Sequence, residues 1–160
     1  MRKNEMSISL DQSDKKILNL IQKDATLTHQ DIAEQTGVSA TSVWRRIKNL
    51  EEVGVIRGQV ALLEPKKIGM QVCALISLRL VRHGEDTRIE FEDFIASRAE
   101  VMECYAVVGN YDYMLVVMVP DVEAYEIFLS RHLLSHPLVA SSNSSFTLRR
   151  VKYTTAHSLI

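Results

Sequence analysis

The feature that most limits the folds open to this chain is a short turn, Gly37-Val38-Ser39, between two predicted helices. Thr28 and Asp31 form the pattern of a capping box, which predicts the start of the helix before the turn. Glycine accepts the left-handed backbone that often ends a helix, and a serine can cap the next one. With an earlier apolar repeat at helical spacing, this predicts a helix-turn-helix domain over residues 1–56.

The third predicted helix separates apolar from polar side chains. Val43, Ile47 and Leu50 share one face at about 100° per residue, and hydroxyl and cationic groups occupy the other. Such groups contact phosphates and base edges in the major groove, so the pattern predicts binding of double-stranded DNA. The alternative is a solvated face of an ordinary helical bundle. The candidate DNA-binding residues are Thr28, Ser39, Thr41, Ser42, Arg45, Arg46 and Lys48.

Two side chains on the flanks of this helix have competing interpretations. Arg46 can contact a phosphate or pair with an acid of its own domain, because it lies near the apolar stripe. Trp44 is expected to pack between helices rather than to stack on DNA, because its position is lateral.

The charge balance restricts how DNA can be bound. The chain has 19 basic and 20 acidic residues, a formal net charge of −1, which excludes a polybasic mode of binding. Residues 1–64 carry nine basic and nine acidic side chains. Binding must therefore depend on where the charges are placed.

The second part of the chain, residues 68–160, alternates strand and helix patterns in the order βαββαβ. Strands are predicted at 72–81, 101–108, 113–119 and within 139–153, and helices at 86–98 and from Pro120-Asp121 onward. This order predicts an α+β domain of the ferredoxin-like type, joined through a linker at 57–67. Apolar residues on both faces of the third strand predict an uncovered sheet face and association with another copy.

No apolar run is long enough to span a membrane, and no signal peptide is predicted behind Met1–Glu5. Cys73 and Cys104 lack a paired spacing, which favours reduced thiols in the cytoplasm. His132 and His136 stand four residues apart, yet no further ligand accompanies them, so no metal site is expected. The sequence offers no phosphate-binding glycine loop and no nucleophile motif, and the chain is not predicted to be an enzyme.

In both halves the chain resembles the Lrp/AsnC ("feast/famine") family of bacterial transcription regulators. The resemblance extends from Leu10 to about Leu159 and depends on the order and spacing of several short motifs. These are Leu10-Asp11, Asp14, Ile17-Leu18, Ile32-Ala33, Gly37-Val38-Ser39, Arg45-Arg46-Ile47, Gly54-Val55-Ile56, Ile68-Gly69, Gly109–Leu115, Ser144-Ser145-Phe146 and Val151–Thr155.

The resemblance implies a mechanism. The first domain would bind DNA at the nucleoid, a β-hinge near Arg57–Leu63 would follow, and the second domain would form a homodimer that assembles into a tetramer or octamer. A small amino acid, for example leucine, methionine or cysteine, would bind between dimers and alter assembly and DNA affinity. The alternative is a sensing and assembly module that does not bind DNA.

The family's effector turn matches Gly109–Tyr113 here. Asp112 is suited to neutralise the ammonium of an amino acid, and backbone N–H groups of the turn are suited to its carboxylate. Asn110 departs from the acidic residue usual at its position, which removes one negative charge. The candidate effector-binding residues are Gly109, Asn110, Tyr111, Asp112, Tyr113, Ser142 and Ser144.

Overall fold

The structure, a computed structural model, describes residues 8–160. The prediction that no signal peptide follows Met1–Glu5 lies outside these residues. The chain divides into two compact units, the first formed by the segment up to Ala61 together with Lys152–Ile160, the second by Leu62–Val151. Among the helices of residues 8–160, none is both long and apolar enough to cross a membrane.

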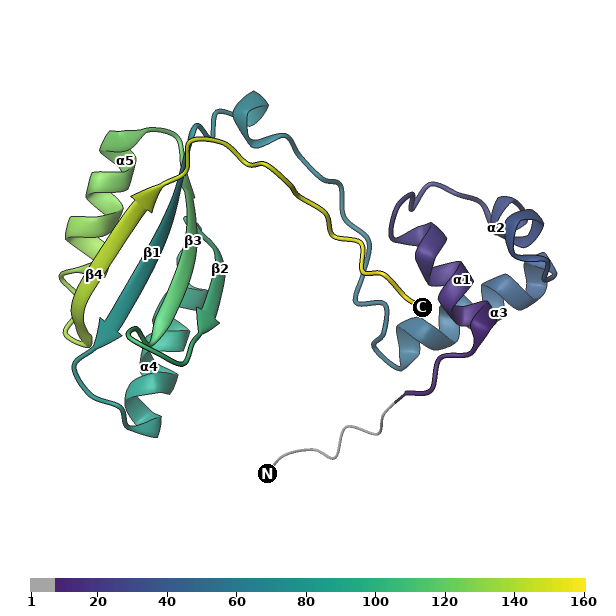
Figure 1. Cartoon of the computed structure of the whole chain (residues 1–160), viewed down its shortest axis with the longest axis horizontal. Coiled ribbons are helices and arrows are strands. Elements are labelled where there is room, and N and C mark those ends of the chain that lie inside the picture. The colour runs from purple at the N-terminus through teal and green to yellow at the C-terminus, as the bar shows by residue number, and fades with distance from the viewer. Residues whose placement is uncertain (1–7) are drawn as a thin grey trace. The chain divides into compact units, whose positions relative to one another are not determined.

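The first unit contains three helices, α1 (Gln12–Ile21), α2 (His29–Thr36) and α3 (Ala40–Glu52), shown in Figure 1. They pack around Ile17, Ile32 and Val43, each at most 1% exposed. Between α2 and α3, Gly37 has φ +75°, a conformation that favours glycine. The helix-turn-helix prediction is therefore confirmed.

Each of these helices begins at a side-chain cap. Asp11 and Thr28 form capping boxes with Asp14 and Asp31, and the Ser39 hydroxyl accepts from the Ser42 backbone N–H at 3.3 Å. Caps of this kind satisfy backbone donors that would otherwise lack partners, which matters most for helices this short.

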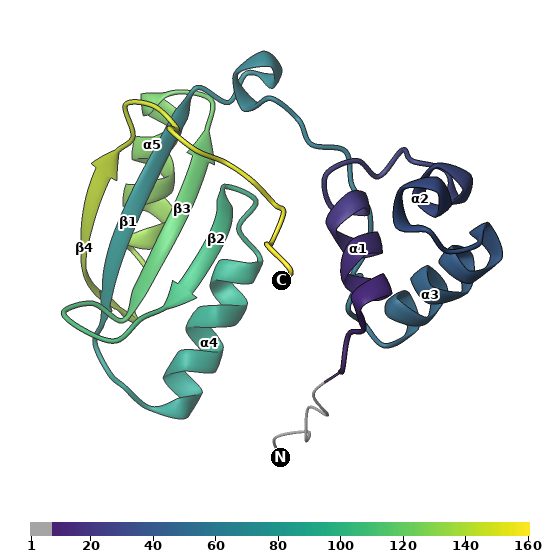
Figure 2. The same cartoon turned by 45° about the vertical axis from the view of Figure 1, so that its right-hand side comes forward.

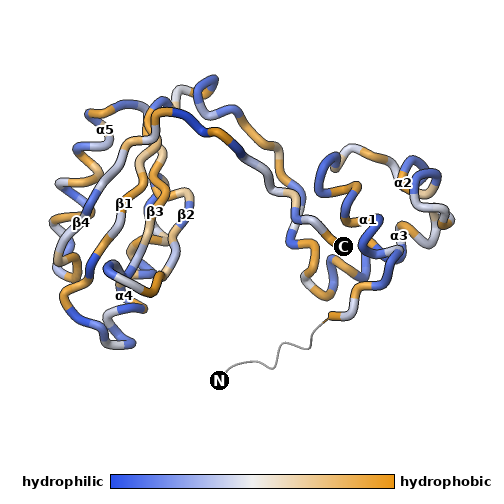
Figure 3. Tube along the Cα trace, in the orientation of Figure 1, coloured by the Kyte–Doolittle hydropathy of each residue, from blue (hydrophilic) through white to orange (hydrophobic). Residues whose placement is uncertain are grey.

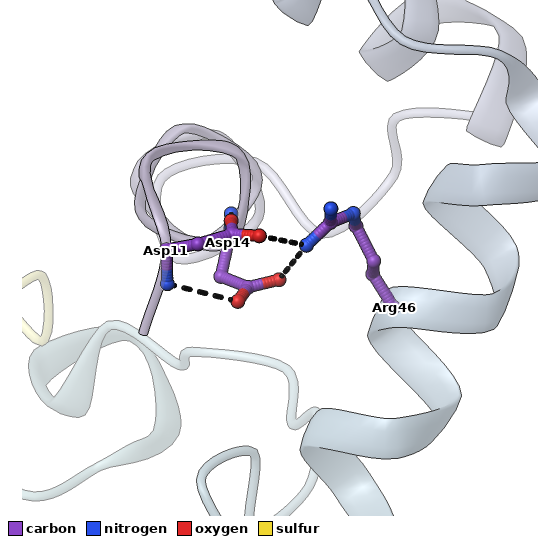
Figure 4. Close-up of polar contacts among 3 residues, drawn as sticks. All are labelled: Asp11, Asp14 and Arg46. Carbon is purple, nitrogen blue, oxygen red and sulfur yellow. Dashed lines mark hydrogen bonds and ion pairs between the residues drawn. The ribbon is translucent and has the colours of Figure 1, made fainter. Parts of the chain in front are cut away.

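An ion pair between side chains of α1 and α3 adds to the apolar contact. Figure 4 shows the Arg46 guanidinium beside the carboxylates of Asp11 and Asp14, each 2.7 Å from Nη1. Hydrogen bonds from the Asp14 backbone N–H and then from Arg46 lower the pKa of Asp11 below its usual value. Of the two interpretations of Arg46, the structure supports pairing within its own domain.

The second unit is a four-stranded antiparallel sheet with two helical segments on one face (Figures 1 and 2). Along the chain these are β1 (Val72–Leu80), α4 (Glu85–Ala96), β2 (Val101–Ala106), β3 (Tyr113–Val119), α5 (Val122–Ile127), which continues into the π-helical η2 (Phe128–Leu133), and β4 (Val139–Phe146). The strand order β2-β3-β1-β4 agrees with the predicted ferredoxin-like arrangement.

Alternation along β1 and β3 decides which side chains are buried. Ile76 pairs with Leu115, and both lie beneath the helices, at most 1% exposed. The hydrophobic stretches of these strands are visible in Figure 3. Their neighbours Leu75 and Met114 face the other way and are each 41% exposed. The sheet therefore leaves one apolar face uncovered in the single chain.

The last strand, predicted within residues 139–153, occupies the first part of that range and ends at Phe146. Two other segments differ from the sequence predictions. Residues 57–64 form no strand, so the expected β-hinge is instead an irregular segment followed by a 3₁₀ turn, η1 (Pro65–Ile68). The tail Lys152–Ile160 belongs to the helix-turn-helix unit, although it was predicted within the second domain.

Core packing in the second unit gives a direct test of this fold. Replacing Leu115 by alanine removes a side chain that is 1% exposed, and we expect a loss of about 2–5 kcal/mol in the free energy of unfolding. Urea denaturation of the full chain measures this loss. The same change at Leu148, 99% exposed, should alter the free energy by less than about 0.5 kcal/mol. Equal losses at the two positions would contradict the assigned burial.

Candidate functional sites

The exposed face of α3 carries the groups suited to DNA. Thr41, Arg45 and Lys48 are exposed, whereas Ser42 is half-buried. Arg45 takes part in none of the ion pairs or side-chain hydrogen bonds found within residues 8–160, so its guanidinium is available to an external anion. Lys48 lies 4.0 Å from a carboxylate oxygen of Glu52, an exposed pair of the weak kind.

The start of α3 differs from the starts of the other two helices. Acidic residues occupy the first turns of α1 (Asp14) and α2 (Asp31), but the first turn of α3 contains none. The partial positive charge at the N-terminus of α3 is therefore not neutralised by a carboxylate of its own, which suits a phosphate.

Three of the remaining DNA-binding candidates have a role inside the domain. Thr28 and Ser39 cap α2 and α3, and their hydroxyls lie at these helix starts. The Arg46 guanidinium is bound by its two aspartates. The packing predicted for Trp44 is not found: its side chain is 50% exposed, with Lys48 Nζ 5.4 Å from the ring centroid.

In the second unit, Asp112 fixes the turn between β2 and β3. Its Oδ2 accepts a hydrogen bond of 2.7 Å from the Leu80 backbone N–H at the end of β1. Its own N–H donates to the Leu78 carbonyl at 2.8 Å, and its carbonyl accepts from the Val107 N–H at 2.9 Å. The second carboxylate oxygen lies 3.4 Å from His83 Nδ1.

The same carboxylate lines a cavity of about 510 Å³. The cavity walls come from the end of β1, the start of α4, the end of β2 and the turn before β3. Basic and acidic side chains both line it: Arg82, His83 and Arg88, and the carboxylates Glu85 and Asp112. A zwitterion is a ligand complementary to such a mixed lining.

The predicted effector residues fall into two groups. Asp112 and Tyr113 line the cavity, but Ser142 and Ser144 do not: they lie on β4, paired with Leu78 and Ile76. Gly109 has φ +145°, which favours glycine at the turn. The Arg79 guanidinium donates to the Asn110 carbonyl and lies 6.0 Å from the Tyr111 ring centroid.

Sequence reasoning did not identify Arg82, His83, Glu85 or Arg88. The predicted topology could have identified them. In the antiparallel sheet, the segment that follows the first strand lies beside the turn that precedes the third strand.

The cavity residues Arg88 and Tyr113 both contact Glu92. Arg88 lies 3.7 Å from Glu92, which also accepts a hydrogen bond of 2.8 Å from the Tyr113 hydroxyl. Burial, and then this bond, raise the pKa of Tyr113, so the phenol stays protonated.

The other candidate reactive side chains, His136 and Cys104, do not form a catalytic or metal site in the described residues. His136 stacks on Phe94, with ring centroids 4.2 Å apart, and accepts from the Leu138 N–H. Desolvation and then Glu92 raise the pKa of the Cys104 thiol to about 11, so it is not a ready nucleophile. In the described part of the chain, no cluster of three or more potential metal ligands is present.

Comparison with known proteins gives the family of both units. Residues 10–57 match the winged helix-turn-helix DNA-binding domain, and residues 73–157 match the Lrp/AsnC ligand binding domain. The DNA-binding transcriptional activator DecR of Escherichia coli is 36% identical over 92% of this chain and 97% of its own length. A glutamate uptake regulatory protein of Zymomonas mobilis is 36% identical over 91% of this chain and 88% of its own.

Solved structures agree with these matches. A transcriptional regulator of Neisseria meningitidis in complex with L-methionine has a TM-score of 0.88 and 34% identity, covering 93% of this chain and 96% of its own. An AsnC family regulator of Agrobacterium tumefaciens has a TM-score of 0.86 and 39% identity, covering 91% and 95%. These relatives are regulators rather than enzymes, as the sequence predicts. The chain therefore belongs to the Lrp/AsnC family, the DNA-binding transcription regulators with an amino-acid-binding domain.

Proposed function

We propose that this regulator binds a free α-amino acid in the cavity beside Asp112, and that the bound amino acid alters its assembly and its affinity for DNA. The observation that carries the proposal is the carboxylate of Asp112, a cavity-lining group with one oxygen held by the Leu80 N–H and the other 3.4 Å from His83 Nδ1. The protein acts in the cytoplasm, where it controls genes of amino acid metabolism or transport.

The charges around the cavity give each end of an amino acid a partner. The ammonium group binds Oδ1 of Asp112, the oxygen that lies 3.4 Å from His83 Nδ1, and Glu85 also lines the cavity. Arg82 takes part in none of the ion pairs formed within residues 8–160, so it is the cation best placed to bind the carboxylate. Effector candidates are leucine, methionine and cysteine, with methionine supported by the bound ligand of the Neisseria relative.

The uncovered face of the sheet supplies the contact between subunits. Leu75, Met114 and Tyr105 are large side chains on this face, each more than two-fifths exposed in the single chain. Burying them against a second copy forms a homodimer by the hydrophobic effect, and dimers build the tetramer or octamer. Two helix-turn-helix units on a twofold axis then contact half-sites about one helical turn apart.

Arg45 and Arg46 form a matched pair for testing the DNA contact. Arg45→Ala should weaken DNA binding by about 1–3 kcal/mol and reduce the salt dependence by about one phosphate contact, without affecting stability. Arg46→Ala removes the same charge but breaks the contact with Asp11 and Asp14, so it should lower the unfolding temperature of the first unit. Fluorescence anisotropy at several salt concentrations and calorimetry measure the two effects. An unchanged salt dependence in Arg45→Ala would contradict the proposed DNA contact.

A thermal-shift screen tests the effector site. An amino acid at about 100 times its dissociation constant stabilises the folded state by about 2.7 kcal/mol, and we expect one of the panel to do so. Asp112→Asn should abolish the shift, because the amide keeps an oxygen for the Leu80 N–H but loses the charge. Asp93→Asn, an exposed acid on α4 outside the cavity lining, should keep it. A full shift in Asp112→Asn would overturn the assignment of the ammonium site.

The proposed dimer contact is tested by Met114→Lys. A charge at the centre of the uncovered sheet face should weaken self-association by about tenfold or more. Sedimentation velocity over a range of protein concentrations measures this. Val122→Lys places the same charge on an exposed residue at the start of α5 and should leave the sedimentation coefficient unchanged. If the two variants sediment alike, another surface joins the subunits.

A further inference from the structure

The C-terminal tail of the chain lies along α1. The Gln22 carboxamide donates to the His157 carbonyl at 2.5 Å and accepts from the His157 N–H at 2.7 Å. The Asn19 carboxamide donates to the Leu159 carbonyl at 2.9 Å and accepts from the Leu159 N–H at 3.4 Å. Lys15 donates to the backbone oxygen of Ile160. The same face of α1 makes all these contacts.

This arrangement recognises an extended backbone rather than particular side chains. A carboxamide carries one acceptor and two donors, so it can pair with a peptide unit much as a neighbouring strand does. Positions 15, 19 and 22 follow the helical repeat, and positions 157 and 159 follow the two-residue repeat of an extended chain. The two carboxamides also hydrogen-bond to each other at 3.2 Å, which orients them before the tail arrives.

The helix that binds the tail also holds the DNA-contacting helix. On other sides of α1, Ile17 packs against the core shared with α2 and α3, and Asp14 binds Arg46 of α3. The tail itself continues directly from β4 of the second unit. A docked tail therefore joins the two units by a second chain segment, in addition to the linker that follows α3.

We propose that Lys15, Asn19 and Gln22 form a docking face for residues 157–160 of the same chain, and that the docked tail restrains the orientation of the DNA-binding unit. With the tail docked, less orientational freedom is lost on binding DNA, so affinity and half-site spacing are both sharpened. The contacts are polar and largely exposed, which makes docking reversible. The proposal requires DNA binding but not the effector cavity.

The test compares the full chain with Asn19→Ala/Gln22→Ala. Alanine is the best helix former, so α1 itself should persist, which circular dichroism checks. Hydrogen exchange read by mass spectrometry should show the amides of residues 157–160 exchanging about tenfold faster or more. DNA affinity should fall about fivefold or more, with weaker discrimination between half-site spacings. A chain ending at Ala156 should behave in the same way.

Gln12→Ala is the matched control, because Gln12 is an exposed amide one turn before Lys15, and none of the hydrogen bonds found within residues 8–160 joins its side chain to the tail. It should leave tail exchange, affinity and spacing preference as in the wild type. Unchanged tail exchange in the double variant would show that the docking face does not hold the tail. Faster tail exchange with unchanged affinity and spacing preference would overturn its role as a restraint. The effector thermal shift should persist in every variant, which separates failure here from failure of the proposed effector site.

Discussion

The contact between Arg46 and the two aspartates of α1 is the constraint on which the geometry of the DNA-binding unit depends. Its helices are 8 to 13 residues long, a length at which an isolated helix is marginal in water. The apolar cluster that joins them is small, with four buried members. Arg46 of α3 pairs with Asp11 and Asp14, the two residues of the α1 capping box. This ion pair therefore fixes the orientation of α3 relative to α1. The side chains of Arg46 and Asp14 are only 27% and 16% exposed, so solvent screens this pair less than it would a surface pair.

Asp112 has a comparable role in the second unit, although its structural task and its proposed ligand contact compete for one carboxylate. One oxygen is held by the Leu80 N–H and fixes the turn to β1, while the other lies 3.4 Å from His83 Nδ1, and both residues line the cavity. In the proposed complex, a ligand ammonium would act on the group that positions the turn. Binding and turn geometry would then be coupled through a single residue, without any long relay of side chains.

Local features could be predicted from sequence, and long-range features could not. The helix starts at Asp11, Thr28 and Ser39 depend on residues three positions away, and β3 was predicted with its observed bounds because a turn and an apolar run define it. The cavity depends on contacts such as Leu80 to Asp112, 32 residues apart, and the tail on Asn19 to Leu159, 140 apart. The hydrophobic periodicity of a sequence gives no information about contacts between residues so far apart. The sequence placed the last strand only within residues 139–153 for the same reason, since the end of β4 depends on its pairing with β1.

Net charge describes this DNA-binding unit poorly, because the position of each carboxylate matters more than their number. Three acids of the first unit cap helices or neutralise a cation: Asp11 and Asp14 bind Arg46, and Asp31 caps α2, where the Thr28 hydroxyl keeps its pKa below the usual value. Asp14 and Asp31 lie in the first turns of α1 and α2, where the helix dipole also compensates them. Only α3 begins without an acid, and Arg45 follows one turn later on its exposed face. Residues 1–64, with a net charge of zero, can thus present uncompensated positive charge at the helix proposed to contact the phosphates.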